Sequence, residues 1–161
     1  MVANYASGSV AALRIDEDGS LVKSASAHQH EGSSINPRRQ KGPHAHSIYP
    51  GPDNEFAYSP DLGIDQVIIY RLNAATGTLE RTGAAPTTPG AGPRHMKFSR
   101  DGRYAYVLTE LHLTVAVYDR NPENGLLGRA KQEVRSLPGD VQLEGMSSVS
   151  YTHLTLPTID R

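Results

Sequence analysis

An internal repeat constrains the fold of this chain more than any other feature. The segment from Gly92 to Leu127 aligns without a gap on the earlier segment from His44 to Leu79. The matched positions are Phe56-Ala57-Tyr58 with Tyr104-Ala105-Tyr106, Val67 and Ile69 with Val115 and Val117, Tyr70 with Tyr118, and Gly77-Thr78-Leu79 with Gly125-Leu126-Leu127. In the same register His46 aligns with Arg94. Each copy opens with a Gly-Pro pair followed by a polar side chain suited to face a ligand.

A third, partial copy lies at the N-terminus. It aligns Val10, Ala12 and Leu13 with Val67, Ile69 and Tyr70, and Asp18-Gly19-Ser20-Leu21 with Thr76-Gly77-Thr78-Leu79. Strand-rich repeats with a period of about 40–50 residues predict propeller blades, each an antiparallel sheet of about four strands. We therefore expect an all-β fold, a partial β-propeller over residues 1–147 with repeats at about 1–27, 42–84 and 92–137.

Both ends of the chain carry expectations of their own. Residues 1–5 resemble the middle of a strand, which predicts that the N-terminus has been cut. Residues 148–161 resemble the translated read-through of a transposase adapter used in preparing sequencing libraries, so we expect a non-native tail. The alternative is a genuine edge strand that ends at Pro157.

Composition excludes several classes of function. With 16 Lys and Arg against 17 Asp and Glu, the net charge of −1 gives no footprint for nucleic acid or an anionic membrane. No apolar run approaches the length of a membrane span. The absence of cysteine removes disulfides, thiolate catalysis and cysteine-based zinc sites. The one basic cluster, residues 38–41, is interpreted as a solvated loop.

Short runs of β-branched and aromatic residues, separated by Gly and Pro, predict strands and no helix. In the first blade we expect strands at residues 2–5, 10–15 and 21–27. The other two blades are predicted at 46–50, 56–59, 66–72 and 79–84, and at 94–99, 103–108, 113–119 and 127–134. Residues 28–42 lack a period and are predicted to be a long exposed connection, a kind of segment that often carries function.

This strand order gathers polar residues at one end of the blades. The segments before the innermost strands and the loops after the second strands should lie on one face and converge on the mouth of the central channel. The side chains concerned are His44, His46, Asp61, Arg94, His95 and Glu110. Imidazoles, carboxylates and a guanidinium around a concave site suit the binding of a small anion and the activation of a water.

Some of these histidines and carboxylates have other interpretations. A His before the inner strand and an acid after the second strand often form a hydrogen-bonded pair that stabilises a propeller blade. For His95 and Asp61 this structural role is an alternative of at least equal weight to a functional one. Two His-x-His pairs indicate a metal site, because alternate residues of a strand share a face; they are His28 with His30 and His44 with His46. No carboxylate is predicted nearby to complete such a site, and we expect no metal.

Several motifs at consistent spacing resemble the lactonase family of seven-bladed propellers. They are VANY and GSV near the start, GPHAH, DLG followed by D, GPRH with FSRDGRYAYVL, and TEL followed by TVAVY. The family contains the cycloisomerase-type bacterial 6-phosphogluconolactonases and the fungal carboxymuconate-lactonizing enzymes. The resemblance covers residues 2–127, and so implies about three blades of an expected seven.

The resemblance also implies roles for individual residues. His46 in PHAH, Arg94 in GPRH and Glu110 in TEL match the family's catalytic positions, and His44, Asp61 and His95 are expected to orient them or bind substrate. A further Arg that the family supplies from a later blade has no counterpart, and Thr109 stands where the family more often has Asn. The fragment alone is therefore expected to be inactive.

Lactone hydrolysis needs a base for the attacking water and a donor for the oxyanion. We expect His46 or Glu110 to be the base, and Arg94 to bind a phosphate or carboxylate or to stabilise the oxyanion. The predicted function is hydrolysis of a small anionic sugar lactone, such as 6-phosphogluconolactone, without a cofactor, by a cytoplasmic protein that is monomeric at full length. The alternatives are a muconate-type lactonizing cycloisomerase and a non-catalytic propeller that binds a ligand or protein.

Overall fold

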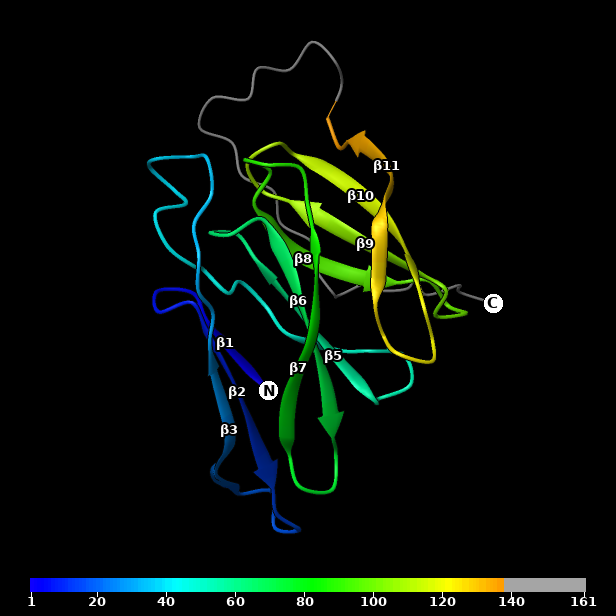
Figure 1. Cartoon of the computed structure of the whole chain (residues 1–161). Coiled ribbons are helices and arrows are strands. Elements are labelled where there is room, and N and C mark those ends of the chain that lie inside the picture. Colours follow the sequence, from blue (N-terminus) through cyan, green and yellow to red (C-terminus); the bar gives the residue numbers. More distant parts are fainter. Residues whose placement is uncertain (138–161) are drawn as a thin grey trace, which may run out of the picture.

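The computed structural model describes residues 1–137, without the side chains of residues 23–25, as three antiparallel sheets with no helix (Figure 1). The predicted tail lies outside these residues. The first sheet contains β1 (Val2–Asn4), β2 (Ser9–Ile15) and β3 (Leu21–Gln29). The second contains β4 (Tyr49–Pro50), β5 (Phe56–Asp61), β6 (Gln66–Asn73) and β7 (Thr78–Pro86). The third contains β8 (Pro93–Phe98), β9 (Tyr104–Thr109), β10 (Thr114–Arg120) and β11 (Leu127–Arg135). The prediction of an all-β chain of antiparallel blades is confirmed.

The sequence repeat reappears in the pairing of the strands. Ala57 pairs with Tyr70 in the second sheet, and the equivalent residues Ala105 and Tyr118 pair in the third. A register shift follows Ile69 in β6 and Val117 in β10, and the first sheet has the same shift after Ala12. A bulge bends a strand and increases its twist. The three blades therefore share their curvature as well as their strand order.

One predicted strand is much shorter than expected. The innermost strand of the second blade was predicted at residues 46–50, but β4 covers only Tyr49–Pro50. The register of β4 on β5 places Pro60 opposite Ser47, and proline has no N–H to donate to a ladder. In the third blade the equivalent of Pro60 is Leu108, which pairs with His95, so β8 keeps its ladder at this position and has a register shift only between Pro93 and His95. The proline therefore interrupts the ladder locally, and pairing resumes before it through His46 N, which donates to the carbonyl of Pro60 at 3.0 Å, and through the bridge of Ala45 with Asp61.

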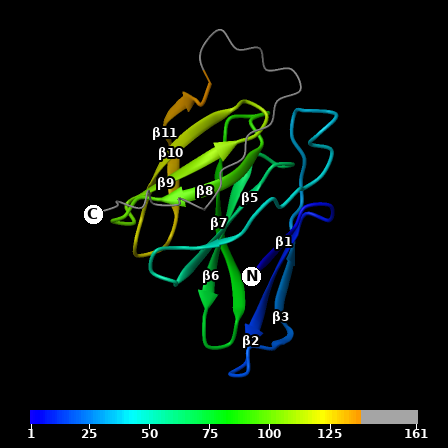
Figure 2. The same cartoon turned by 180° about the vertical axis from the view of Figure 1, so that it is seen from behind.

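The middle sheet is buried on both faces. In β6, Val67 and Ile69 pack toward the third sheet, whereas Ile68 and Tyr70 pack toward the first. Every residue of β5 is buried. Figures 1 and 2 show the middle sheet between its two neighbours from opposite sides. Side chains alternate across a strand, so this sheet contributes to two separate cores.

The turn between β10 and β11 inserts into one of these cores. Gly125 has a φ of +71°, and a Cβ at this position would lie 2.4 Å from the ring of Phe56. Tyr58 donates from its hydroxyl to the carbonyl of Gly125 at 2.8 Å and accepts from Arg120 Nε at 2.7 Å. Only glycine combines that φ with so close an approach.

The connection between the first two blades is partly buried, so the prediction that residues 28–42 are exposed is wrong in part. The side chains of His30 and Gln40 are only 2% and 1% exposed. Gln40 donates to the carbonyl of Leu62 at 2.8 Å. Arg38, in contrast, is exposed as expected.

No helix long and apolar enough to cross a membrane occurs among residues 1–137.

The third sheet leaves an apolar face uncovered within the described residues. Ala105 and Val107 of β9 point into the core with the second sheet, so Tyr106 points the other way and is 38% exposed. Val134 of β11, on the same face, is 49% exposed. In a propeller the next blade covers such a face.

We predict that the isolated 161-residue chain self-associates through this face. Light scattering after size exclusion should show aggregates or swapped oligomers. Tyr106→Lys combined with Val134→Lys should reduce association, whereas Ile35→Lys, which alters an exposed apolar residue elsewhere, should not. A monodisperse wild-type chain that melts cooperatively as a monomer would contradict this expectation.

Candidate functional site

Two connections and two loops meet at one end of the second and third sheets. In the second sheet Leu62 N donates to the carbonyl of His44 at 3.0 Å. In the third, Glu110 N donates to the carbonyl of Gly92 at 2.8 Å, which is the equivalent bond of the next repeat. The repeat thus places the segment before each inner strand against the loop after each second strand.

His46, Arg94 and Glu110 are in mutual contact at this end. Arg94 Nε lies 2.9 Å from His46 Nε2 and 2.9 Å from Glu110 Oε2. The imidazole and the carboxylate are 3.7 Å apart, between His46 Nε2 and Glu110 Oε2. The side chain of Glu110 is 7% exposed, and those of His46 and Arg94 are each 17% exposed. The cluster is shielded from solvent but can still be reached from it.

Arg39 joins this cluster, and the sequence analysis missed it. Its Nη2 donates to Glu110 Oε1 at 2.6 Å, so the two oxygens of Glu110 accept from two different guanidinium groups. Arg39 lies in the connection at residues 28–42, outside the repeat, where residues 38–41 were interpreted as a solvated loop. The length of that connection was the one feature of the sequence that could have pointed to Arg39, because long loops on rigid scaffolds often carry function.

The surroundings of His46 favour a neutral imidazole. Burial, and next the positive charge of Arg94, lower the pKa of His46 below its ordinary value of 6.5, while Glu110 opposes the shift. Nε2 accepts from Arg94, so the ring proton is on Nδ1. Nδ1 is buried and has no hydrogen-bond partner among the described residues. His46 can therefore take up a proton only at Nε2.

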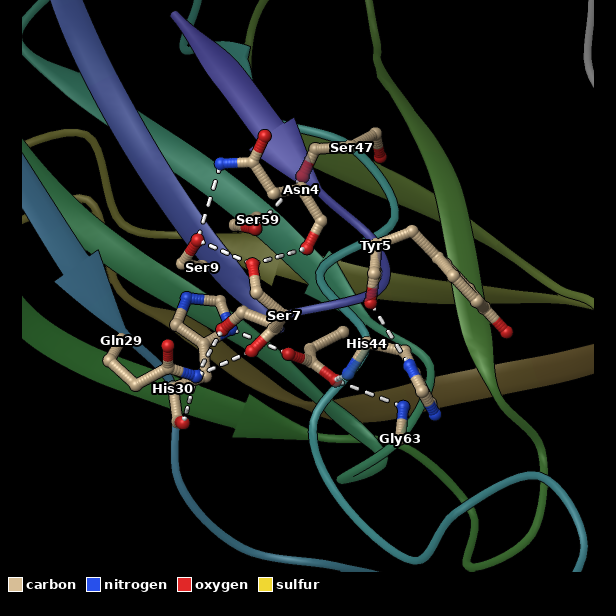
Figure 3. A network of polar contacts seen from close by, with 12 residues as sticks. Asn4, Tyr5, Ser7, Ser9, Gln29, His30, His44, Ser47, Ser59 and Gly63 are labelled. Carbon is tan, nitrogen blue, oxygen red and sulfur yellow. Dashed lines mark hydrogen bonds and ion pairs between the residues drawn. The ribbon is translucent and has the colours of Figure 1, made fainter.

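Aromatic rings line one side of the cluster. His44 stacks on Tyr5 with ring centroids 4.6 Å apart, and its Nδ1 lies 3.0 Å from the carbonyl of Tyr5 (Figure 3). Tyr5 and His95 each meet the ring of His46 edge-on, at 5.2 and 5.4 Å. These contacts hold the His46 ring in place. His44 and His95 thus lie beside the ring of His46.

Asp61 lies beneath the cluster and is fully buried. It accepts from His30 Nδ1 at 2.6 Å, and from the backbone N–H groups of His44 at 2.7 Å and Gly63 at 2.9 Å, part of the network in Figure 3. The repeat explains its position, because Asp61 is equivalent to Thr109, whereas Leu62 is equivalent to Glu110. Neighbouring residues of a strand point to opposite sides. Asp61 therefore lies on the other face of the second sheet from Glu110, and its hydrogen bonds go to His30 and to backbone N–H groups.

A second buried carboxylate, Asp65, bonds to the segments that carry Arg39 and Arg94. Asp65 accepts from Ser34 Oγ at 2.5 Å and from the N–H groups of Gly90 at 2.6 Å and Gly92 at 2.7 Å. These partners come from the connection that carries Arg39 and from the segment that leads to Arg94. Asp65 thus fixes the two guanidinium-bearing segments relative to each other.

The His-x-His pairs do not form a metal site with their neighbours. His28 Nε2 lies 2.8 Å from the carbonyl of Leu79, and His30 lies between Asp61 and the hydroxyl of Tyr70. Burial raises the pKa of Tyr70 to about 12, which keeps that hydroxyl protonated. Within residues 1–137, no three His, Cys, Asp or Glu side chains are grouped to hold a metal ion.

Comparison with known proteins adds independent findings. A family model described as a seven-bladed β-propeller lactonase matches residues 1–155. A 6-phosphogluconolactonase of Bacillus subtilis strain 168 is 39% identical over 140 residues, which cover 87% of this chain and 39% of that protein. A 6-phosphogluconolactonase of Pectobacterium carotovorum is 38% identical over 88 residues, which cover 53% of this chain and 26% of that protein.

Two solved structures are also similar to this chain. A Lactobacillus plantarum protein matches with a TM-score of 0.80 at 33% identity, over 87% of this chain and 40% of that one. A periplasmic gluconolactonase of Pseudomonas aeruginosa matches with a TM-score of 0.75 at 38% identity, over 88% of this chain and 40% of that one. The chain thus spans about 40% of the length of these two structures. The term "extended protein" denotes a protein of the full length of these structures that contains this chain.

We predict that Asp65→Asn in the extended protein lowers the free energy of unfolding by about 2–3 kcal/mol. An amide keeps one acceptor oxygen but turns an NH₂ group toward a buried N–H, so at least one charge-assisted bond is lost. Denaturant unfolding measures the change. The matched control is Asp18→Asn, in an exposed turn where the amide oxygen can still accept from Ser20 N. Equal stability of the two variants would contradict the role given to Asp65.

Proposed function

The chain belongs to the lactonase family of seven-bladed β-propellers, and on that premise we propose that the extended protein hydrolyses a phosphorylated sugar lactone, 6-phosphogluconolactone. The observation that carries the proposal is the cluster of a neutral imidazole, a carboxylate and two guanidinium groups at the end of the second and third sheets. The name of the Bacillus subtilis protein supports the phosphorylated substrate, and that of the Pseudomonas aeruginosa gluconolactonase supports lactone hydrolysis alone.

His46 is the general base in this scheme. A water attacks the lactone carbonyl and forms a new C–O bond, while its proton passes to His46 Nε2 and the carbonyl oxygen becomes an oxyanion. The tetrahedral intermediate then collapses, the ring C–O bond breaks, and the ring oxygen takes the proton back from His46. The lowered pKa of His46 keeps the base form available at neutral pH.

Arg94 and Glu110 act together beside this base. Arg94 Nε is shared between His46 and Glu110, so a small shift of the guanidinium toward substrate frees Nε2 for the water. Arg94 then donates to the oxyanion or to the anionic group of the substrate. Glu110, 3.7 Å from Nε2, stabilises the imidazolium that forms. The scheme needs no metal or cofactor.

Asp61 has a supporting role in the proposal. Its bonds to His30 and to the backbone of His44 fix the segment that presents His46. His44 and His95 orient the His46 ring or contact the sugar. We retain the monomeric state and cytoplasmic location of the extended protein as predictions, to be checked by light scattering and cell fractionation.

We predict that Glu110→Gln in the extended protein lowers kcat by about 10²–10⁴. The amide cannot balance the two guanidinium groups or the imidazolium. Product release from 6-phosphogluconolactone, measured above the spontaneous rate, tests this. Glu123→Gln, which changes an exposed carboxylate, should retain wild-type turnover. Near-normal turnover of Glu110→Gln would remove Glu110 from the chemistry.

The same assay separates the alternative functions. A folded wild type that converts a muconate-type acid to its lactone but leaves 6-phosphogluconolactone intact would favour the cycloisomerase. A folded wild type that catalyses neither reaction would favour the propeller that only binds a ligand or protein.

We also predict that the acid limb of kcat/KM lies below pH 6.5. The native pKa of His46 is lower than the unfolded value, so native His46 stays unprotonated as pH falls through 6.5 while unfolded chains bind the proton. The associated stability is complete above pH 6.5 and is lost as pH falls toward the native pKa. A pH–rate profile measures the limb, which should disappear from the residual activity of His46→Gln. A limb at or above pH 6.5 would contradict the assignment.

A further inference from the structure

Arg39 brings a second guanidinium group to the site from outside the repeat. Its Nη2 lies 2.6 Å from Glu110 Oε1 and 3.3 Å from the hydroxyl of Tyr5. Arg94 occupies the other oxygen of the same carboxylate. Two guanidinium groups thus share one carboxylate, next to an imidazole whose surroundings favour the neutral form. The cluster carries an excess of positive charge.

The connection that carries Arg39 is held in place by its own contacts. Asn36 Oδ1 accepts from the N–H groups of Arg38 at 3.0 Å and Arg39 at 3.1 Å. The buried side chain of Gln40 accepts from Asn36 N and donates to the carbonyl of Leu62. Ser34 bonds to Asp65. The backbone at Arg39 is therefore fixed relative to the Gly90–Gly92 segment that leads to Arg94, because Asp65 also accepts from Gly90 N and Gly92 N.

Arg39 also retains donors for a ligand. Its side chain is 41% exposed, and within residues 1–137 only Nη2 has a hydrogen-bond partner. Nε and Nη1 are not among the buried unpaired atoms of the described residues, so they remain available as donors on this partly exposed side chain. A guanidinium offers its donors in a planar fork that matches the oxygens of a phosphate or carboxylate.

We infer that Arg39 is a substrate-binding residue that, opposite Arg94, holds the anionic group of the substrate and selects phosphorylated over neutral lactones. The inference rests on the proposed function. When the anion binds, its oxygens take up the free donors of Arg39, and Glu110 keeps the guanidinium in position. Arg39 does not take part in proton transfer, so its contribution falls on binding.

Steady-state kinetics of the extended protein test this with two substrates, 6-phosphogluconolactone and glucono-1,5-lactone. Arg39→Gln should raise KM for the phosphorylated lactone about tenfold or more, the scale of one charge-assisted hydrogen bond, with little change in kcat. KM for the neutral lactone should change less than about twofold. Arg39→Lys should recover part of the loss, because an ammonium keeps the charge but not the fork. Arg38→Gln removes the same charge from an exposed neighbour and should behave as wild type.

Calorimetric titration with 6-phosphogluconate tests the inference even if the protein hydrolyses no lactone. Arg39→Gln should weaken binding about tenfold and Arg38→Gln should not, which would support Arg39 as an anion ligand while the proposed reaction fails. Equal loss of kcat/KM for both lactones in Arg39→Gln would assign it only to the positioning of Glu110 and overturn the inference. Unchanged binding in Arg39→Gln, or no binding by the folded wild type, would also overturn it.

Discussion

The middle sheet buries side chains on both of its faces, and this burial holds the three sheets together. Val67 and Ile69 face one neighbour while Ile68 and Tyr70 face the other, so each core needs one neighbouring sheet and the two cores together need all three. Apolar burial contributes about 25 cal/mol per Å² and dominates such packing. Because the sheets share strand registers and bulges, fixing one interface also fixes how the loops of adjacent blades meet.

The site forms where this packing brings polar loops together. His46 and Arg94 are equivalent positions of adjacent blades, and their contact at 2.9 Å is the contact of one repeat with the next. Glu110 follows β9 and completes the group. Buried carboxylates below, Asp61 and Asp65, accept from backbone N–H groups of the approaching segments. Charge-assisted bonds of this kind give the loops a rigidity that their small, glycine-rich sequences would not supply.

Departures from the repeat give the site its individual chemistry. Pro60 interrupts the ladder of the second blade, whereas Leu108 at the equivalent position maintains it, and the segment with His44 and His46 is held by separate bonds to the end of β5. The connection at residues 28–42 has no counterpart between the second and third blades, and it supplies Arg39. A repeated scaffold can hold different residues at equivalent positions because the strands, and not the loops, make the cores.

The all-β architecture, the strand order and the proximity of His46, Arg94 and Glu110 could be predicted from the sequence alone. These follow from the repeat that aligns His46 with Arg94, from Gly and Pro at the turns, and from a family resemblance that the match over residues 1–155 confirms. The contact of Arg39 with Glu110 and the pairing of Asp61 with His30 appear only in the folded chain. The first depends on how an aperiodic connection folds back over a neighbouring blade, which no local pattern encodes. The second depends on strand register, where a shift by a single position moves a side chain to the opposite face.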